Sequence, residues 1–379
     1  MPKINYTVVA GMMKRGKAVS RYLAPLSLTL MLMIAASTAF AACNKMPHSS
    51  DAVRIDSYYL TGLRENKEHF RDLFTLLARE NNSPEVTFAV VREIANGLAR
   101  VKEYGKLIHF LSKRTFNFPD DPYNSYYLLM TAYAYMQQDA LPVAAQYFDL
   151  IVKNYPDLTV NGESIHLACL NQLIRLSTNP MQQVWYYQEL ITRFSDMTDM
   201  GMAWFMLAQT YERIGDWNNA LLAYNSYQPY AGSLIPGFPD AENYARQQVL
   251  FSKSNKDWTY ESLPALYAAV TEALDSGSSR ELARCYAKVN FFTRSWGQGE
   301  IDNSGQLAFN LANFMFGNRI RYADKLDASS NSAEAYLRTW GWSQYLSTWY
   351  LYFRKIYFPS DPEIHGRWEW AGIYYGEKF

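Results

Sequence analysis

The spacing of apolar residues divides the chain into a long helical part and a shorter part with strands. From residue 52 to residue 234, apolar positions recur every three or four residues, which predicts a series of amphipathic helices. Beyond the Pro- and Gly-rich stretch 233–239, the same spacing predicts helices at 240–252, 261–274 and 279–293. The period then falls to two, which predicts strands at 334–342, 345–357 and 366–375.

Aromatic residues dominate the predicted strands. Trp349, Leu351 and Phe353 fall on one side of a strand, whereas Tyr350 and Tyr352 fall on the other. Helices followed by strands predict an α+β domain with an antiparallel sheet over residues 238–379. We expect its tryptophans to cluster on the sheet, namely Trp340, Trp342, Trp349, Trp368 and Trp370.

The stretch that begins at Gly201 has the pattern of a helical hairpin. Its sequence is GMAWFMLAQTYERIGDWNNALLAYNSYQPY, with a predicted turn at Gly215 and Asp216. The first helix carries Trp204, Leu207 and Tyr211, and the second carries Trp217, Ala220 and Tyr224. This order resembles the tetratricopeptide repeat family, in which stacked helix pairs form a solenoid. A small residue such as Ala220 is needed where the paired helices cross closely.

The same frame recovers further units along the chain. Residues 125–158 place Leu128, Ala132, Tyr135, Ala144, Phe148 and Pro156 at the corresponding positions. A weaker unit at 164–197 has Leu167, Leu170, Ile174, Tyr187 and Leu190, with Gln183 in place of the small residue. Residues 86–119 predict a degenerate capping pair, and 52–80 predict one long leading helix. The resemblance implies an α-helical solenoid over 52–237; a plain helical bundle with accidental spacing is the alternative.

The family resemblance also implies a binding surface. In tetratricopeptide proteins, particular positions of each first helix line a concave groove that holds a partner protein. The matching residues are Tyr126, Leu129, Tyr133, Met136, Ile165, Ala168, Gln172, Arg175, Met202, Phe205, Gln209 and Glu212. An apolar groove is usually filled, so the alternative to a partner is filling by the protein's own carboxy-terminal region.

The amino terminus has the order of an export signal. An uncharged run from Leu23 to Ala42 ends in small residues beside Cys43. Basic residues precede it, namely Lys14, Arg15, Lys17 and Arg21. We therefore predict a signal peptide over 1–42, with translation starting at Met12 or Met13, and a tether over 43–51. A transmembrane anchor is the alternative, because the run is just long enough to span a bilayer.

The junction Phe40-Ala41-Ala42-Cys43 resembles the lipobox of bacterial lipoproteins. This resemblance implies palmitate-type lipidation of Cys43 and anchoring of the chain outside the cytoplasm, at the periplasmic face of a membrane. Phe40 replaces the usual Leu, and Ala39-Phe40-Ala41 also fits an ordinary cleavage site that would release a soluble protein. Cys169 and Cys285 fall in helical patterns and are predicted to be small core residues, although a disulfide between them stays open.

Composition narrows the possible chemistry. A formal net charge of zero and the lack of a basic, aromatic-rich run argue against nucleic acid as a partner. The sequence contains no HExxH, GxSxG, GxxxxGK[ST] or GxGxxG motif, so we expect neither an enzyme nor a cofactor. No histidine has a second His or Cys at the spacing of a metal site; the histidines are His48, His69, His109, His166 and His365. Four carboxylates near the strands could support hydrolysis only if the fold brought two together: Glu334, Asp361, Glu363 and Glu369.

The carboxy-terminal region has a second resemblance. The stretch SLPALYAAVTEALDSGSSRELARCYAKVNFF and the terminal GRWEWAGIYYG are similar to nuclear transport factor 2-like domains, whose curved sheet and helices enclose a pocket. This similarity implies two alternative functions: binding of a small apolar or sugar-like ligand in an aromatic pocket, or an enzyme on this fold. The leading expectation is a membrane-anchored scaffold for protein-protein interaction in an envelope assembly or transport complex. Its repeat region looks similar to helical lipoproteins of outer-membrane barrel assembly and to helical components of periplasmic TRAP uptake systems.

Overall fold

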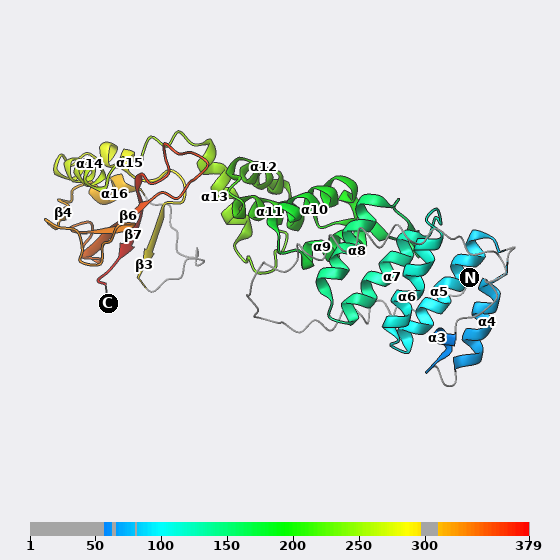
Figure 1. The fold of residues 1–379 in the computed structure, drawn as a ribbon. Coiled ribbons are helices and arrows are strands. Elements are labelled where there is room, and N and C mark those ends of the chain that lie inside the picture. The colour runs from blue at the N-terminus through cyan, green and yellow to red at the C-terminus, as the bar shows by residue number, and fades with distance from the viewer. Residues whose placement is uncertain (1–56, 63–65, 80–81, 297–309, 379) are drawn as a thin grey trace, which may run out of the picture. The chain divides into compact units, whose positions relative to one another are not determined.

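The computed structural model describes residues 57–62, 66–79, 82–296 and 310–378 (Figure 1). Contacts along the chain group it into two compact units, one ending at Ser177 and the other beginning at Thr178. This division differs from the boundary predicted after residue 237. Leu221, in the last predicted helix pair, packs against Phe251 and Phe358 in one hydrophobic cluster, so this pair is joined to residues beyond 237. Among the described helices, none combines the length and the apolar character that a membrane span requires.

The first unit consists of helices and one short hairpin. Its helices are α3 Ser57–Leu60, α4 Lys67–Leu77, α5 Pro84–Arg100, α6 Tyr104–Asn117, α7 Asn124–Gln137, α8 Leu141–Asn154 and α9 Ile165–Leu176. The hairpin pairs β1 Thr159–Val160 with β2 Glu163–Ser164, and its turn is Asn161-Gly162 with positive φ at both residues. Ser164 then accepts a hydrogen bond from the amide of Leu167 and caps α9.

Small residues allow close helix crossing in the first unit. At the α7–α8 pair, Ala132 and Ala144 are fully buried, and so is the Phe148 ring. Phe148 packs edge-on against Tyr133, with 5.5 Å between ring centroids. The core of this pair therefore combines small side chains with aromatic rings, as its sequence predicted.

The prediction of one long helix over 52–80 is wrong within the described residues. Two helices, α3 and α4, occupy this stretch. Gly62 lies between them with φ of +78°, a conformation that ends a right-handed helix at little cost only for glycine.

The second unit begins with four further helices. They are α10 Pro180–Arg193, α11 Met200–Arg213, α12 Trp217–Tyr227 and α13 Ala241–Lys253, with short 3₁₀ turns at η3 Ser195–Met197 and η4 Gln228–Tyr230. Gly215 has φ of +77° between α11 and α12, and Asp216 caps α12 by accepting a hydrogen bond from the amide of Asn219. Ala220 and Tyr224 are buried where α12 packs on α11. The predicted helix, turn and helix are therefore confirmed.

A five-stranded sheet and three short helices complete the second unit. The helices are α14 Leu263–Asp275, α15 Ser279–Cys285 and α16 Leu311–Met315. The strands are β3 Phe292–Ser295, β4 Arg321–Tyr322, β5 Glu334–Trp340, β6 Thr348–Lys355 and β7 Trp368–Tyr375, in the order β3-β7-β6-β5-β4. Strands β5, β6 and β7 confirm the alternating segments, although each is shorter than predicted.

The sheet is antiparallel over its four neighbouring strands β4 to β7, as predicted, and is mixed because of one edge strand. Strand β3 runs parallel to β7, whereas the other neighbours are antiparallel. The predicted helix 279–293 also ends early, at Cys285. From Tyr286 the backbone is extended and pairs with the sheet, since the amide of Ala287 donates to the carbonyl of Trp370 over 2.8 Å.

One face of the sheet packs against α14, α15 and α16, which lie on the same side of it in Figure 1. Trp342 and Trp349 stack in this core with 4.8 Å between centroids, and Trp368 and Trp370 are buried beside them. Trp340 does not belong to this cluster, contrary to expectation. Its register places it with Tyr336 and Arg338 on the opposite face of β5, because side chains alternate along a strand.

Candidate functional site

The residues predicted to line a groove lie on α7, α9 and α11. On α7, Tyr126, Leu129 and Tyr133 are buried, and Met136 is half-buried. Burial raises the pKa of Tyr126 and Tyr133 to about 12 each, so both phenols are neutral at ordinary pH. These side chains contribute to the core of the first unit rather than to an open surface.

The α9 residues differ in exposure. Ile165 and Gln172 are buried, Ala168 is half-buried, and Arg175 is exposed. The Arg175 guanidinium donates a short hydrogen bond to the side-chain oxygen of Gln172. On this helix, Arg175 is the predicted groove residue most available to a partner.

The predicted groove residues of α11 are apolar at the start of the helix and polar at its end. Met202 is 39% exposed, whereas Phe205 is fully buried against Tyr224 and Phe238. Phe238 follows α12, so this position is filled by the chain itself. Gln209 and Glu212 remain half-buried.

Glu212 is the predicted groove residue with the most unusual electrostatics. The Tyr244 hydroxyl donates to its two carboxylate oxygens over 3.0 and 3.3 Å, and the Gln209 amide donates to one of them over 3.3 Å. Burial raises the pKa of this carboxyl, although the Tyr244 hydroxyl acts in the opposite direction. A cavity of about 20 Å³ adjoins it, lined by Trp217, Tyr244 and Tyr357 among others. That volume holds a water molecule and not a side chain.

A larger cavity of about 240 Å³ lies between α13 and the end of β6. Gln247, Asn290, Arg354 and Glu369 contribute polar groups to its lining. Glu369 is buried and accepts hydrogen bonds from Trp258 Nε1 and from Arg354. Phe251, Tyr357 and Phe358 contribute rings to the same lining. The space between the sheet and its helices is occupied by the tryptophan core.

The second face of the sheet carries a surface that we call the aromatic face. It consists of Phe292 and Trp296 from β3 and the residue after it, Tyr336 from β5, Tyr350 and Tyr352 from β6, and Tyr374 from β7. Register explains its assembly: Tyr352 lies opposite Tyr336 on one side and Gly372 on the other. A Cβ at Gly372 would lie 2.7 Å from the Phe292 ring, so glycine allows that ring to cover β7.

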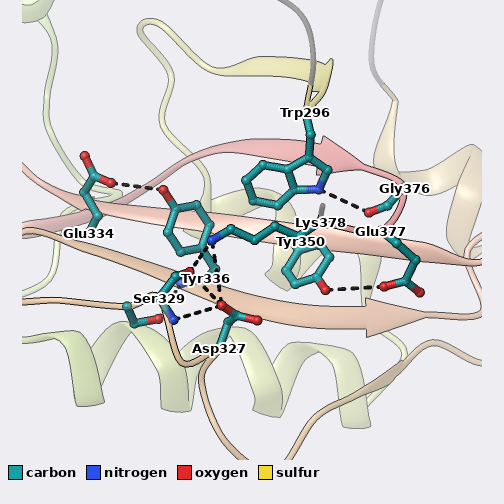
Figure 2. Close-up of polar contacts among 10 residues, drawn as sticks. Trp296, Asp327, Ser329, Glu334, Tyr336, Tyr350, Gly376, Glu377 and Lys378 are labelled. Atoms are coloured by element: carbon teal, nitrogen blue, oxygen red, sulfur yellow. Dashed lines mark hydrogen bonds and ion pairs between the residues drawn. The ribbon is translucent and has the colours of Figure 1, made fainter.

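Charged side chains lie beside part of the aromatic face: Figure 2 shows Asp327, Glu334, Glu377 and Lys378 near Trp296, Tyr336 and Tyr350. Glu377 accepts from Arg338 over 2.7 Å and from the Thr348 hydroxyl over 2.6 Å. The Thr348 hydroxyl bond, with Arg338, lowers the pKa of Glu377. The Lys378 ammonium lies over the rings of Trp296 and Tyr336, at 5.0 and 4.5 Å from their centroids. The Glu377 carboxylate and the Lys378 ammonium thereby attach the segment after β7 to the aromatic face.

This assembly was missed by sequence reasoning. The alternation of Tyr350 and Tyr352 indicated a second aromatic side, but Trp296, Asp327 and Lys378 come from separate segments. Only the parallel pairing of β3 with β7 brings Trp296 against Tyr374, where the two rings stack at 4.3 Å.

The remaining sequence candidates are cysteines and histidines. Cys43 and His48 lie outside the described residues. Cys169 and Cys285 are buried free thiols, as predicted for core residues. Three histidines form hydrogen bonds: His109 with the Tyr59 hydroxyl, His166 with the carbonyl of Tyr155, and His365 with the amide of Phe358. The His69 ring packs edge-on against Phe70. Within the described residues, no three His, Cys, Asp or Glu side chains are grouped so that they could hold a metal ion.

The carboxylates near the strands are held by neighbours. Register places Arg354 between Glu334 on β5 and Glu369 on β7. Asp361 and Glu363 lie in the loop before β7, where the Asp361 carboxylate accepts from the Glu363 amide over 3.2 Å. The Arg354 guanidinium forms an ion pair with Glu369 over 2.8 Å, whereas the Glu334 carboxylate accepts a hydrogen bond from the Tyr336 hydroxyl over 3.0 Å.

Models of known protein families, curated proteins and solved structures yield no match to this chain.

Proposed function

We propose that this chain is an exported, lipid-anchored protein of tetratricopeptide type that binds a partner protein through its helix pairs. The supporting observation is the equivalence of two pairs. Ala144 and Ala220 are buried at the same position of their second helices, and Phe148 and Tyr224 are fully buried one turn later. Equal positions with equal burial favour a repeated unit over a bundle with accidental spacing.

The exposed part of the predicted groove supports binding of a protein. In the second unit, Met202 presents a flexible apolar side chain and Glu212 a half-buried carboxylate; in the first unit, Arg175 presents a cation. Methionine adapts to varied apolar surfaces, and buried or partly buried charges give a partner orientation. The buried members of the groove would then support these side chains rather than touch the partner.

A matched pair of substitutions tests this proposal. Met202→Asp places a charge on the predicted binding surface, and Leu222→Asp places one on α12, where Leu222 is 65% exposed and outside the predicted groove. We expect native protein and Leu222→Asp to co-purify a partner in fixed stoichiometry from solubilised envelopes, and Met202→Asp to lose most of it. Equal recovery with both variants would contradict the proposal.

The anchor requires a separate measurement. Mass analysis of the mature amino terminus should find a diacylglyceryl-modified Cys43 as its first residue. A mature chain that retains Ala42, with an unmodified Cys43, would overturn the lipoprotein part of the proposal and leave the repeat part standing.

A further inference from the structure

The Lys378 side chain occupies a site with the chemistry of a cation receptor. Its ammonium lies over the Tyr336 and Trp296 rings at 4.5 and 5.0 Å, and 3.8 Å from the Asp327 carboxylate. It also donates a short hydrogen bond to the Ser329 hydroxyl. Ring faces attract cations through their quadrupoles, and a carboxylate adds Coulomb attraction. Four groups from three segments, namely the residue after β3, the loop before β5 and β5 itself, thus converge on one ammonium (Figure 2).

Contacts other than those to Lys378 hold these groups in place. Trp296 stacks on Tyr374 with 9° between ring planes, and its indole N–H donates to the carbonyl of Gly376 over 3.2 Å. The Tyr336 hydroxyl donates to Glu334 over 3.0 Å. The walls of the site are therefore expected to persist when the Lys378 side chain leaves.

Asp327 is likewise oriented by its own loop. Its carboxylate accepts from the amide of Ser329 over 3.0 Å and from the Ser329 hydroxyl over 2.6 Å. These two bonds, with a smaller contribution from Lys378, lower the pKa of Asp327. The carboxylate is consequently ionised over the neutral range and available to a cation.

The site is accessible from solvent. The side chains of Lys378 and Asp327 are 30% and 26% exposed. Glu377, through Arg338 and Thr348, holds the segment after β7 independently. The Lys378 side chain can therefore rotate away while the backbone of Glu377 stays attached.

We propose that Trp296, Tyr336 and Asp327 form a receptor site for a lysine side chain of a partner protein, which Lys378 fills in the free chain. A primary ammonium donates three hydrogen bonds, which suits the Ser329 hydroxyl and the Asp327 carboxylate, whereas a quaternary ammonium donates none. Lys378 acts as a tethered competitor that excludes weak cations. This inference concerns the sheet and stands or falls independently of the repeats.

Butylammonium, an analogue of the lysine side chain, tests the site directly. Saturation-transfer NMR measures its binding to the full mature chain in detergent. With the tethered competitor removed, Lys378→Ala should bind butylammonium about tenfold more tightly than the native chain. Thermal unfolding of each variant verifies that it remains folded.

The control removes an equivalent charge elsewhere. Lys288 lies over one ring, Tyr286, at 4.2 Å and donates to the carbonyl of Ala283, without an aromatic pair. Lys288→Ala should leave butylammonium binding at the native level, and Tyr336→Leu in the Lys378→Ala background should abolish the gain. Equal binding by the native chain and Lys378→Ala would overturn the proposal. Tighter binding of tetramethylammonium than of butylammonium by Lys378→Ala would overturn the assignment to lysine.

Discussion

Aromatic side chains have different roles in the helix pairs and in the sheet. Between α11 and α12, the Tyr224 ring is buried beside Ala220, so aromatic and small residues share one apolar layer. The sheet instead carries aromatic residues on both faces. Trp342 and Trp349 stack on the inner face, whereas Tyr336 and its neighbours on the outer face bind charged groups. In the helix pairs the rings lie within apolar layers and only their hydroxyls meet polar groups, as where Tyr224 accepts a hydrogen bond from Gln209. On the outer face of the sheet the rings themselves also lie against a charged side chain, that of Lys378.

The largest expected loss of stability comes from a substitution on the inner face of the sheet. Trp370 is fully buried, its indole N–H donates to the carbonyl of Gly372 over 2.8 Å, and Phe291 packs edge-on against it. Trp370→Ala should lower the free energy of unfolding by about 3 to 5 kcal/mol, because it leaves a large cavity. Urea denaturation followed by circular dichroism measures this loss.

Tyr352→Ala on the outer face is the matched comparison. Its ring contacts Tyr336, Phe292 and Tyr374 at centroid distances of 5.3, 5.6 and 5.7 Å. We expect a loss of roughly 1 to 2 kcal/mol, from a few cross-strand pairs. Equal losses for Trp370→Ala and Tyr352→Ala would show that both faces are core, and would remove the distinction drawn above.

The next effect concerns the helix pairs. Ala220→Trp should overpack the crossing of α11 and α12 and cost about 1 to 3 kcal/mol or more, since Ala220 is buried there. Leu222→Trp, two residues along the same helix but exposed, should change stability by less than about 0.5 kcal/mol. Differential scanning calorimetry compares them; an unchanged melting temperature for Ala220→Trp would mean that the repeat frame is wrong.

Local patterns allowed prediction of the helix pairs and of three strands. The positions of α11, α12 and β5 to β7 follow from periodicity within each segment, and Gly215 and Asp216 mark the turn between helices. The strand β3 has no such signal, because it is short and its partner β7 is distant in sequence. The prediction of a helix through Phe292 failed for that reason.

The aromatic face could not be predicted as a site. Trp296, Asp327 and Lys378 are uninformative singly, and strand pairing alone brings them together. The exposure of the predicted groove residues also depends on parts of the chain that lie outside their own helices. Sequence identified which helix face was apolar, but burial of Phe205 by the chain's own Phe238 depends on the path of the loop after α12.

The carboxyl groups of Glu212, in the helix pairs, and Glu377, beside the sheet, should differ in pKa. Burial raises the pKa of Glu212, and the Thr348 hydroxyl with Arg338 lowers that of Glu377. NMR titration of side-chain carboxyl carbons should place the midpoint of Glu212 above, and that of Glu377 below, the usual value for glutamate. A lowered midpoint for Glu212 would mean that its hydrogen bonds outweigh its burial, and a raised midpoint for Glu377 would contradict its hydrogen bonds to Thr348 and Arg338.

The two pKa shifts make the stability of the fold depend on pH in opposite directions. Because the folded-state pKa of Glu377 is lowered, its stabilising contribution is complete above the unfolded pKa and is lost as pH falls through the folded pKa. For Glu212 the folded-state pKa is raised, so ionisation destabilises the fold at neutral pH, and this cost disappears as pH falls through that raised value. Glu212→Gln should therefore be neutral or slightly stabilising at pH 7, whereas Glu377→Gln should be slightly destabilising.

The smallest effect is expected at the surface ion pair. Arg338 and Glu377 are 2.7 Å apart, with side chains 45% and 55% exposed. Arg338→Ala should cost no more than about 1 kcal/mol, and high salt should reduce the difference from the native chain. A larger loss that persists in high salt would mean that this contact supports the aromatic face more than its exposure suggests.

Site-specific photo-crosslinking in intact cells tests most directly whether the helix pairs bind the partner. A benzophenone amino acid at position 202 probes the predicted groove, and one at position 345 probes the hairpin between β5 and β6, where Tyr345 is 95% exposed. We expect one discrete heterotypic adduct from position 202 and none of that mass from position 345. The same adduct from position 345, with none from position 202, would move partner binding from the repeats to the sheet and contradict the proposed function.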